Sequence, residues 1–239
     1  MGRGPSIEGR KNAEDARKAK VFTKLIREIT VAARTGADPA TNARLRAGID
    51  KALAANMTKD TIERAVRRGS GADGADNMQE LRYEGYGPSG VALIIDAMTD
   101  NAQRTVADVR HALAKHGGNL GTTGSVAFQF HRLGEIVVDT GKPGSDDKVL
   151  EIALDAGADD VQTDAAQTTV LTSADSLDAV KKALAAAGFT PVSADVVMRP
   201  ENRVAVDPEV AETLRDLIDW LEELDDVQDV YHNAALPNA

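Results

Sequence analysis

Carboxylates and histidines are the side chains with which this sequence could perform catalysis or bind a metal ion. Asp96 and Asp100 lie four residues apart and could share a cation, but a strand end and a helix N-cap account for both adequately. The chain has no cysteine, which excludes disulfides, thiolate metal sites and a cysteine nucleophile. We therefore expect no enzymatic activity, no metal and no other cofactor. The histidines are scattered, without metal-ligand spacing, at His111, His116, His131 and His232.

Two further segments could contact a phosphate or a base. Residues 117–125, Gly-Gly-Asn-Leu-Gly-Thr-Thr-Gly-Ser, could approach a phosphate through backbone N–H groups, although they match no nucleotide-binding spacing. A helix C-cap followed by a hairpin turn is the interpretation we favour for them. Residues 83–90 place Tyr83 and Tyr86 in a predicted glycine-containing loop. These tyrosines could stack on nucleobases or pack between domains, and the sequence leaves both roles open.

Lysine and arginine side chains give the strongest signal. Along residues 10–34, at about 100° per residue, an apolar stripe faces one side and cations face the other. Cations in register on a rigid helix suit a polyanion backbone, although an ordinary solvated helix face would look the same. Arg64, Arg67 and Arg68 would equally suit the dipole of a helix's last turn. The predicted nucleic-acid contacts are Lys11, Arg17, Lys20, Lys24, Arg27, Arg34, Arg44, Lys51, Arg64, Arg67 and Arg68.

The charge of the chain is unevenly distributed. Its net charge is −10, yet residues 1–70 hold 16 Lys and Arg against 8 Asp and Glu, a net of +8. The remaining residues hold 12 against 30, a net of −18. A basic end on an acidic body predicts that one end meets nucleic acid while the rest repels phosphates. The acidic run 222–226 opposes the dipole of its predicted helix, so it fits solubility, a partner surface or repulsion of phosphates.

Helical periodicity predicts three helices in the basic segment, at 10–34, at about 39–56, and after the N-cap Thr58. Gly and Pro residues argue against a helix that begins before Ser6, and residues 69–74 read as a linker. Beyond the linker the pattern alternates between strands and helices. Strands are predicted at 91–96, 125–130, 135–139, 160–163, 168–172, 193–198 and 227–231, with a weak one at 119–121. Helices are predicted after Asn101 and at 147–156, 176–187 and 208–224.

The order of these elements predicts the fold class. Residues 134–200 read as βαββαβ, a complete ferredoxin-like unit, and the elements on either side would join into a second one. We therefore predict an α+β protein in which a three-helix domain precedes two ferredoxin-like domains, one inserted in the other. The predicted domains are residues 1–74, residues 82–132 with 205–239, and residues 134–200. No run of 18 apolar residues or apolar signal region occurs, so we expect a cytoplasmic protein with no membrane partner.

Several motifs resemble the YebC/PmpR family over nearly the whole chain. They include Lys-Val-Phe-Thr-Lys-Leu-Ile-Arg-Glu-Ile at 20–29 and Asp-Asp-Val-Gln-Asp-Val-Tyr at 225–231. The opening Gly-Arg-Gly-Pro-Ser-Ile-Glu departs from the Gly-His-Ser-Lys-Trp common in the family and resembles a variant opening of some members. The other motifs lie at 51–57, 60–64, 83–86, 99–101, 104–110 and 124–128. Candidates for a secondary nucleic-acid contact within them are Tyr83, Tyr86, Asn101 and Arg104.

The resemblance implies a three-domain cytoplasmic protein without enzymatic activity. Bacterial members are described as probable DNA-binding transcriptional regulators, whereas mitochondrial relatives activate translation. We therefore expect a nucleic-acid partner and no small-molecule substrate. The alternative to a DNA-binding transcriptional regulator is a ribosome-associated translation factor that binds ribosomal RNA, and the basic residues alone do not separate the two.

Overall fold

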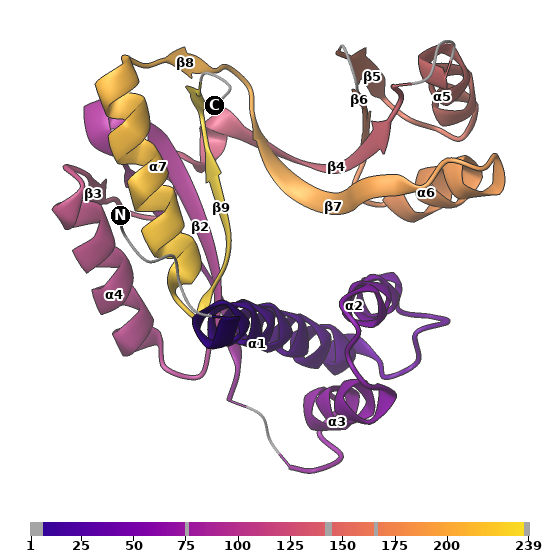
Figure 1. Cartoon of the computed structure of the whole chain (residues 1–239), viewed down its shortest axis with the longest axis horizontal. Coiled ribbons are helices and arrows are strands. Elements are labelled where there is room, and N and C mark those ends of the chain that lie inside the picture. Colours follow the sequence, from indigo (N-terminus) through magenta and orange to yellow (C-terminus); the bar gives the residue numbers. More distant parts are fainter. Residues whose placement is uncertain (1–6, 75–76, 142–144, 165–166, 237–239) are drawn as a thin grey trace. The chain divides into compact units, whose positions relative to one another are not determined.

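The computed structural model describes residues 7–74, 77–141, 145–164 and 167–236, with the backbone alone for 7–15. The chain divides into two compact units (Figure 1). Unit 1 is Met1–Ser125 with Val206–Val230 and Leu236–Ala239, and unit 2 is Val126–Ala205 with Tyr231–Ala235. Unit 1 holds both a helical part and a sheet. We propose that these two parts are separate domains, with the boundaries given above.

The helical part contains α1 (Ile7–Ala32), α2 (Ala43–Ala54) and α3 (Lys59–Gly69). The prediction that no helix begins before Ser6 concerns residues outside the described ranges. A short 3₁₀ turn follows α1, so the predicted extension of the first helix to Arg34 is wrong. The predicted start of the second helix at residue 39 is also wrong, because the Asn42 side chain caps α2 by accepting from the Leu45 N–H at 3.0 Å.

One apolar core joins the three helices. Leu25 and Ile29 of α1 pack with Leu45 of α2 and Ile62 of α3. The predicted N-cap is confirmed, since Thr58 Oγ1 accepts from the Thr61 N–H at 3.3 Å. Gly69 ends α3 so close to α1 that a Cβ there would overlap the Thr30 carbonyl oxygen. The 26-residue α1 therefore buries one side of its C-terminal half and leaves its other side for the cations.

The sheet of unit 1 has the strand order β3-β1-β2-β9. Its strands are β1 (Gln79–Tyr86), β2 (Ala92–Thr99), β3 (Asn119–Leu120) and β9 (Val227–His232), and its helices are α4 (Ala102–Lys115) and α7 (Pro208–Glu223). The predicted pairing of residues 227–231 beside the strand at 91–96 is confirmed. Leu93 of β2 meets Leu214 and Leu217 of α7 over Gly87, where the glycine leaves room for all three side chains.

Two predicted assignments next to this sheet are wrong. Residues 83–86, predicted as the start of a loop, belong to the strand β1, and Gly85 within it lets β3 pass where a Cβ would lie 2.8 Å from the Asn119 carbonyl oxygen. Residues 125–129 are not a strand. Val126 and Phe130 are buried while Phe128 is 72% exposed, because a 3₁₀ turn at 127–129 breaks the strand alternation.

Unit 2 contains the predicted βαββαβ order. Its elements are β4 (Phe130–Asp139), α5 (Ser145–Asp155), β5 (Asp160–Thr163), β6 (Gln167–Thr172), α6 (Leu177–Ala186) and β7 (Pro191–Pro200). The sheet order β5-β6-β4-β7, with every pair antiparallel, is that of a ferredoxin-like unit. Ile136 and Val170 of the sheet pack with Val149 of α5 and Leu184 of α6. Two short strands that were not predicted, β8 (Val204–Ala205) and β10 (Ala234–Ala235), pair in parallel.

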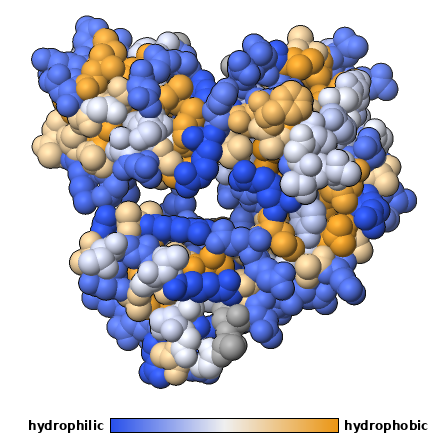
Figure 2. All heavy atoms as spheres, turned by 180° about the vertical axis from the view of Figure 1, so that it is seen from behind, coloured by the Kyte–Doolittle hydropathy of each residue, from blue (hydrophilic) through white to orange (hydrophobic). Residues whose placement is uncertain are grey.

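The surface is mostly polar. Figure 2 shows one face of the molecule, on which hydrophilic residues predominate and apolar residues lie in smaller groups among them. In the part of the chain that the structure describes, none of the helices combines the length and the apolar composition needed to cross a membrane.

Candidate nucleic-acid interface

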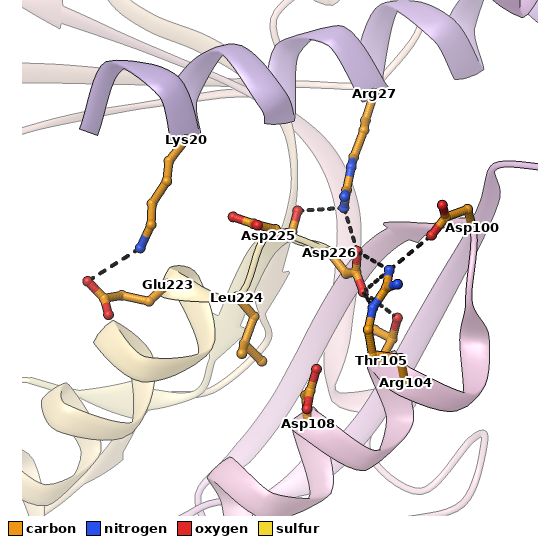
Figure 3. Close-up of a pocket in the computed structure, with 10 residues that line it drawn as sticks. All are labelled: Lys20, Arg27, Asp100, Arg104, Thr105, Asp108, Glu223, Leu224, Asp225 and Asp226. Carbon is orange, nitrogen blue, oxygen red and sulfur yellow. Dashed lines mark hydrogen bonds and ion pairs between the residues drawn. The ribbon is translucent and has the colours of Figure 1, made fainter. Parts of the chain in front are cut away.

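The cations of α1 lie on the face that the sequence predicted, but this face is not open to solvent along its length. Lys20, Lys24 and Arg27 follow one another at spacings of four and three residues, which places them in one row. Opposite this row lie the last turn of α7 and its link to β9, residues 222–226. Figure 3 shows the hollow that Lys20 and Arg27 line together with residues 223–226 and Arg104 of α4. The acidic and basic runs of the sequence thus meet inside unit 1.

Arg27 is largely enclosed by the rest of unit 1. Its side chain is 15% exposed, and its Nη1 donates to Asp226 Oδ1 at 2.7 Å. The same nitrogen reaches the carbonyl oxygens of Met98 at 2.8 Å and Asp225 at 2.5 Å. The prediction that Arg27 lies on an open cationic face is therefore wrong, because β2 and the α7–β9 link supply its acceptors. Its contacts stabilise unit 1 in place of an external ligand.

Asp226 is the centre of this arrangement, which we call the Asp226 junction: Asp226 with Arg27, Arg104 and Thr105. Arg104 Nη2 donates to Asp226 Oδ2 at 2.9 Å, and Thr105 Oγ1 donates to the same oxygen at 2.8 Å. Burial would by itself raise the pKa of Asp226, but the hydrogen bonds from Thr105, Arg104 and Arg27 lower it below its ordinary value. The buried carboxylate therefore remains charged and fully paired.

Lys20 and Lys24 meet weaker partners. Lys20 Nζ lies 3.6 Å from Glu223 Oε1, and both side chains are largely solvated. Lys24 is half-buried, and burial lowers its pKa, while the nearby Glu222 and Asp229 carboxylates act in the opposite direction. Both lysines thus face carboxylates of their own chain, but neither is anchored as Arg27 is.

Three further predicted contacts, Arg34, Arg44 and Lys51, also have internal partners. Arg34 donates to the Met78 carbonyl oxygen. Arg44 binds both carboxylate oxygens of Glu80, at 2.9 and 3.0 Å. Lys51 Nζ lies 3.3 Å from Glu28 Oε1. Lys11 falls in the part of α1 whose side chains are outside the described residues, and Arg17 is exposed.

The arginines of α3 are exposed cations of the predicted set. Ile62 and Ala65 face the core, so Arg64, Arg67 and Arg68 lie on the exposed side. Arg64 and Arg67 form surface ion pairs with Asp60 at 2.9 Å and Asp73 at 2.8 Å. Surface pairs of this kind add little stability, so a phosphate can replace the carboxylates at small cost. The exposed guanidinium groups of α3 form the candidate interface, and Arg17 is a separate exposed cation on α1.

The proposed secondary contacts are mostly engaged within unit 1. Tyr83 and Tyr86 lie in β1, and the Tyr86 hydroxyl donates to the Ser125 carbonyl oxygen at 3.1 Å. Burial raises the pKa of Tyr83, with a further contribution from Asp226. Asn101 caps α4 by accepting from the Arg104 N–H at 3.0 Å. These contacts give Tyr86, Asn101 and Arg104 structural roles within unit 1, and Arg104 belongs to the Asp226 junction.

The glycine segment and the two aspartates have internal roles as well. The predicted C-cap is confirmed, since Gly117 has a φ of +72° and the Gly118 N–H bonds the Leu113 carbonyl oxygen at 2.9 Å. Asp96 pairs with Arg82, while Asp100 pairs with Arg104. Within the described ranges, no three His, Asp or Glu side chains gather closely enough to hold a metal ion.

The comparisons with known proteins cover nearly the whole chain. The family model described as the TACO1/YebC protein N-terminal domain matches residues 4–72, and that of the TACO1/YebC second and third domain matches residues 78–234. A curated relative from Xanthomonas campestris (strain B100), named "Probable transcriptional regulatory protein", is 55% identical and covers 98% of this chain and 97% of its own. A protein of the same description from Stenotrophomonas maltophilia (strain K279a) is 55% identical, over 99% of this chain and 98% of its own.

One solved structure extends the comparison to three dimensions. The crystal structure of a conserved hypothetical protein from Aquifex aeolicus matches with a TM-score of 0.85. It is 42% identical to this chain, covers 94% of it, and is itself covered over 93% of its length. The described fold therefore has a close experimental counterpart.

Proposed function

This chain belongs to the TACO1/YebC family, and from that premise we propose that it is a non-enzymatic, cytoplasmic regulator of gene expression that binds nucleic acid. The observation that carries the proposal is the row of exposed arginines on α3, within a segment of net charge +8. The names of the two curated relatives, which call them probable transcriptional regulatory proteins, support the regulatory part.

The chemistry of the interface is phosphate recognition. A guanidinium group offers paired N–H donors that match two oxygens of a phosphate, and it stays charged at every physiological pH. Arg64, Arg67 and Arg68 project from a helix whose other side is fixed by the apolar core, so their spacing is rigid. Contacts of this type set affinity and orientation and carry little base information. The interface thus accounts for binding and leaves the choice of sequence to other contacts.

A DNA-binding transcriptional regulator is the first form of the proposal, and a translation factor that binds ribosomal RNA is the second. The acidic balance outside residues 1–70, a net of −18, favours the second. Such a surface suits a protein that touches nucleic acid at one end, whereas wrapping a duplex would bring more acidic surface near phosphates. Cross-linking the protein in cells and sequencing the attached nucleic acid separates the two. Promoter DNA would support transcription, and ribosomal RNA would support translation.

Binding at different salt concentrations tests the interface itself. The variant R64Q/R67Q/R68Q should flatten the slope of log affinity against log salt on duplex DNA by roughly 2 to 3 units, since each lost phosphate contact removes about 0.9. The matched control R132Q/K148Q/K182Q removes three exposed cations of unit 2 and should leave the slope nearly unchanged. Equal slopes for wild type and the α3 variant, on both duplex DNA and structured RNA, would contradict the proposal.

The non-enzymatic part of the proposal has its own test. Purified wild type should show no hydrolysis of ATP, GTP or nucleic acid.

A further inference from the structure

The glutamates at the end of α7 have no favourable role within their own helix. Glu222 and Glu223 lie in its last turn, which contains no basic residue, and the carboxyl end of a helix dipole repels negative charge. Both side chains are exposed, so they contribute nothing to the core of unit 1. Their described electrostatic partners are instead Lys20, at 3.6 Å from Glu223, and Lys24, which Glu222 influences.

The contact between α1 and the acidic segment has two layers of different strength. In the inner layer, Arg27 and Arg104 share the buried carboxylate of Asp226 with good hydrogen-bond geometry. In the outer layer, Glu223 pairs with Lys20 in contact with solvent, and the exposed Glu222 acts electrostatically on the half-buried Lys24. Exposed pairs exchange readily with other anions, whereas a buried, hydrogen-bonded pair does not. The outer layer can open while the inner layer holds α1 in place.

The local charge is unfavourable for a phosphate while the outer layer is closed. Three cations of α1, with Arg104 of α4, face five carboxylates of the α7 end and β9, so the sum is negative although α1 itself is basic. The carboxylates are Glu222, Glu223, Asp225, Asp226 and Asp229. A nucleic acid that approaches this face of α1 is therefore repelled until the outer carboxylates move away.

We infer that Glu222 and Glu223 form an intramolecular screen over Lys20 and Lys24, which a nucleic acid must displace before it can use this face of α1. The inference rests on the proposed function and adds an autoinhibitory contact to it. Because the exposed arginines of α3 lie outside the screen, they bind phosphate whether it is open or closed. The screen lowers affinity for polyanions in general and favours ligands with enough phosphates to replace both glutamates.

Neutralising the screen should strengthen binding. The variant E222Q/E223Q should bind duplex DNA and an RNA hairpin about 3- to 10-fold more tightly at low salt. Its salt slope on duplex DNA should steepen by roughly 2 units, because two lysines each gain a phosphate. The matched control E209Q/E212Q changes the same helix by the same charge, about 15–20 Å closer to its start at 1.5 Å per residue, which exceeds the Debye length of about 10 Å. This control should change affinity by less than about 2-fold.

Adding K20Q/K24Q to E222Q/E223Q should abolish the gain in affinity. An equal gain in the control, or a gain that persists without the two lysines, would overturn the inference. If wild type binds with an α3-dependent salt slope and E222Q/E223Q shows no gain, the screen is wrong and the proposed function stands. If neither protein binds any nucleic acid, the proposed function fails and the inference with it.

A measurement without ligand tests the screen as well. The pKa of Lys24 measured by NMR should fall in E222Q/E223Q, because Glu222 raises it in the wild type. An unchanged pKa would also count against the screen.

Discussion

The cations of α1 and the arginines of α3 look alike in sequence and differ in their surroundings. Both groups lie opposite an apolar stripe on a helix of the same core. Arg27 of α1 is enclosed by β2 and the α7–β9 link, whereas Arg64 and Arg67 of α3 form ion pairs with exposed aspartates close in sequence. The comparison shows that the position of a cation on a helix does not decide whether it is available to a ligand. The carboxylates that the fold brings opposite it do.

The largest expected effect is on stability, from Asp226. Replacing it with Ala leaves Arg27 and Arg104 without their shared carboxylate, and removing one partner of a buried pair costs about 3–5 kcal/mol. The free energy of unfolding, measured with urea, should fall by that amount. A surface ion pair contributes less than about 1 kcal/mol. A loss of unfolding free energy in that range would show that the Asp226 junction is no stronger than the ion pairs of α3, and Arg27 would then not differ from the arginines of α3.

A smaller effect is expected from the hydroxyl that supports the same carboxylate. Thr105 is buried, and its Oγ1 donates to Asp226 Oδ2. Thr105→Val keeps the shape and removes the donor, which should reduce the free energy of unfolding by about 1.5–3 kcal/mol, the usual value for a hydrogen bond to a charged group. Thr213→Val on α7 is the control, because its hydroxyl bonds only a helix carbonyl at an exposed site. Similar losses of unfolding free energy in both variants would mean that the hydrogen bond to Asp226 is no stronger than one to a helix carbonyl.

The junction should also have a characteristic pH dependence. The pKa of Asp226 is lowered in the folded chain, so the stability it contributes is present above the ordinary carboxyl value of about 4 and is lost as the pH falls through the lower folded value. The difference in unfolding free energy between wild type and Asp226→Asn should therefore stay constant from neutral pH to about pH 5 and shrink below about pH 4. A difference that does not change down to pH 2 would contradict a charged Asp226.

The smallest effect on stability is expected from the arginines of α3. Each of the changes in R64Q/R67Q/R68Q should alter the free energy of unfolding by less than about 0.5 kcal/mol, because exposed side chains outside special features rarely do more. Thermal unfolding of this variant beside wild type measures the effect. A loss of several kcal/mol would place these arginines in the same structural class as Arg27.

Local patterns predicted much of the fold. The βαββαβ order of residues 134–200 and the pairing of residues 227–231 followed from alternation and helical periodicity, and the cap at Thr58 followed from its position. The strand at 79–86 was missed because Gly85, which the fold needs for the close approach of β3, reads as a loop signal. The strand predicted at 125–130 failed because its alternating residues form a 3₁₀ turn.

The candidate site was less predictable than the fold. Arg27 and Asp226 are 199 positions apart, and no periodicity within a helix indicates such a pair. Two signals in the sequence pointed toward it without identifying it. One was the acidic run 222–226, which opposes its own helix dipole, and the other was the opposite charge of the two ends of the chain. Together, these two signals would have predicted a contact between the basic and acidic segments. The structure is needed to show which cations that contact removes from the surface.

A footprint of the bound nucleic acid on the protein shows directly whether α3 forms the interface. Amide hydrogen exchange of the wild-type protein should be measured alone, with a short duplex DNA and with an RNA hairpin, at low salt. We expect at least one ligand to slow exchange in α3 and in α1 around Arg17, while α5 and α6 of unit 2 are unchanged. Protection confined to unit 2, or binding of a ligand without protection of α3, would contradict this expectation.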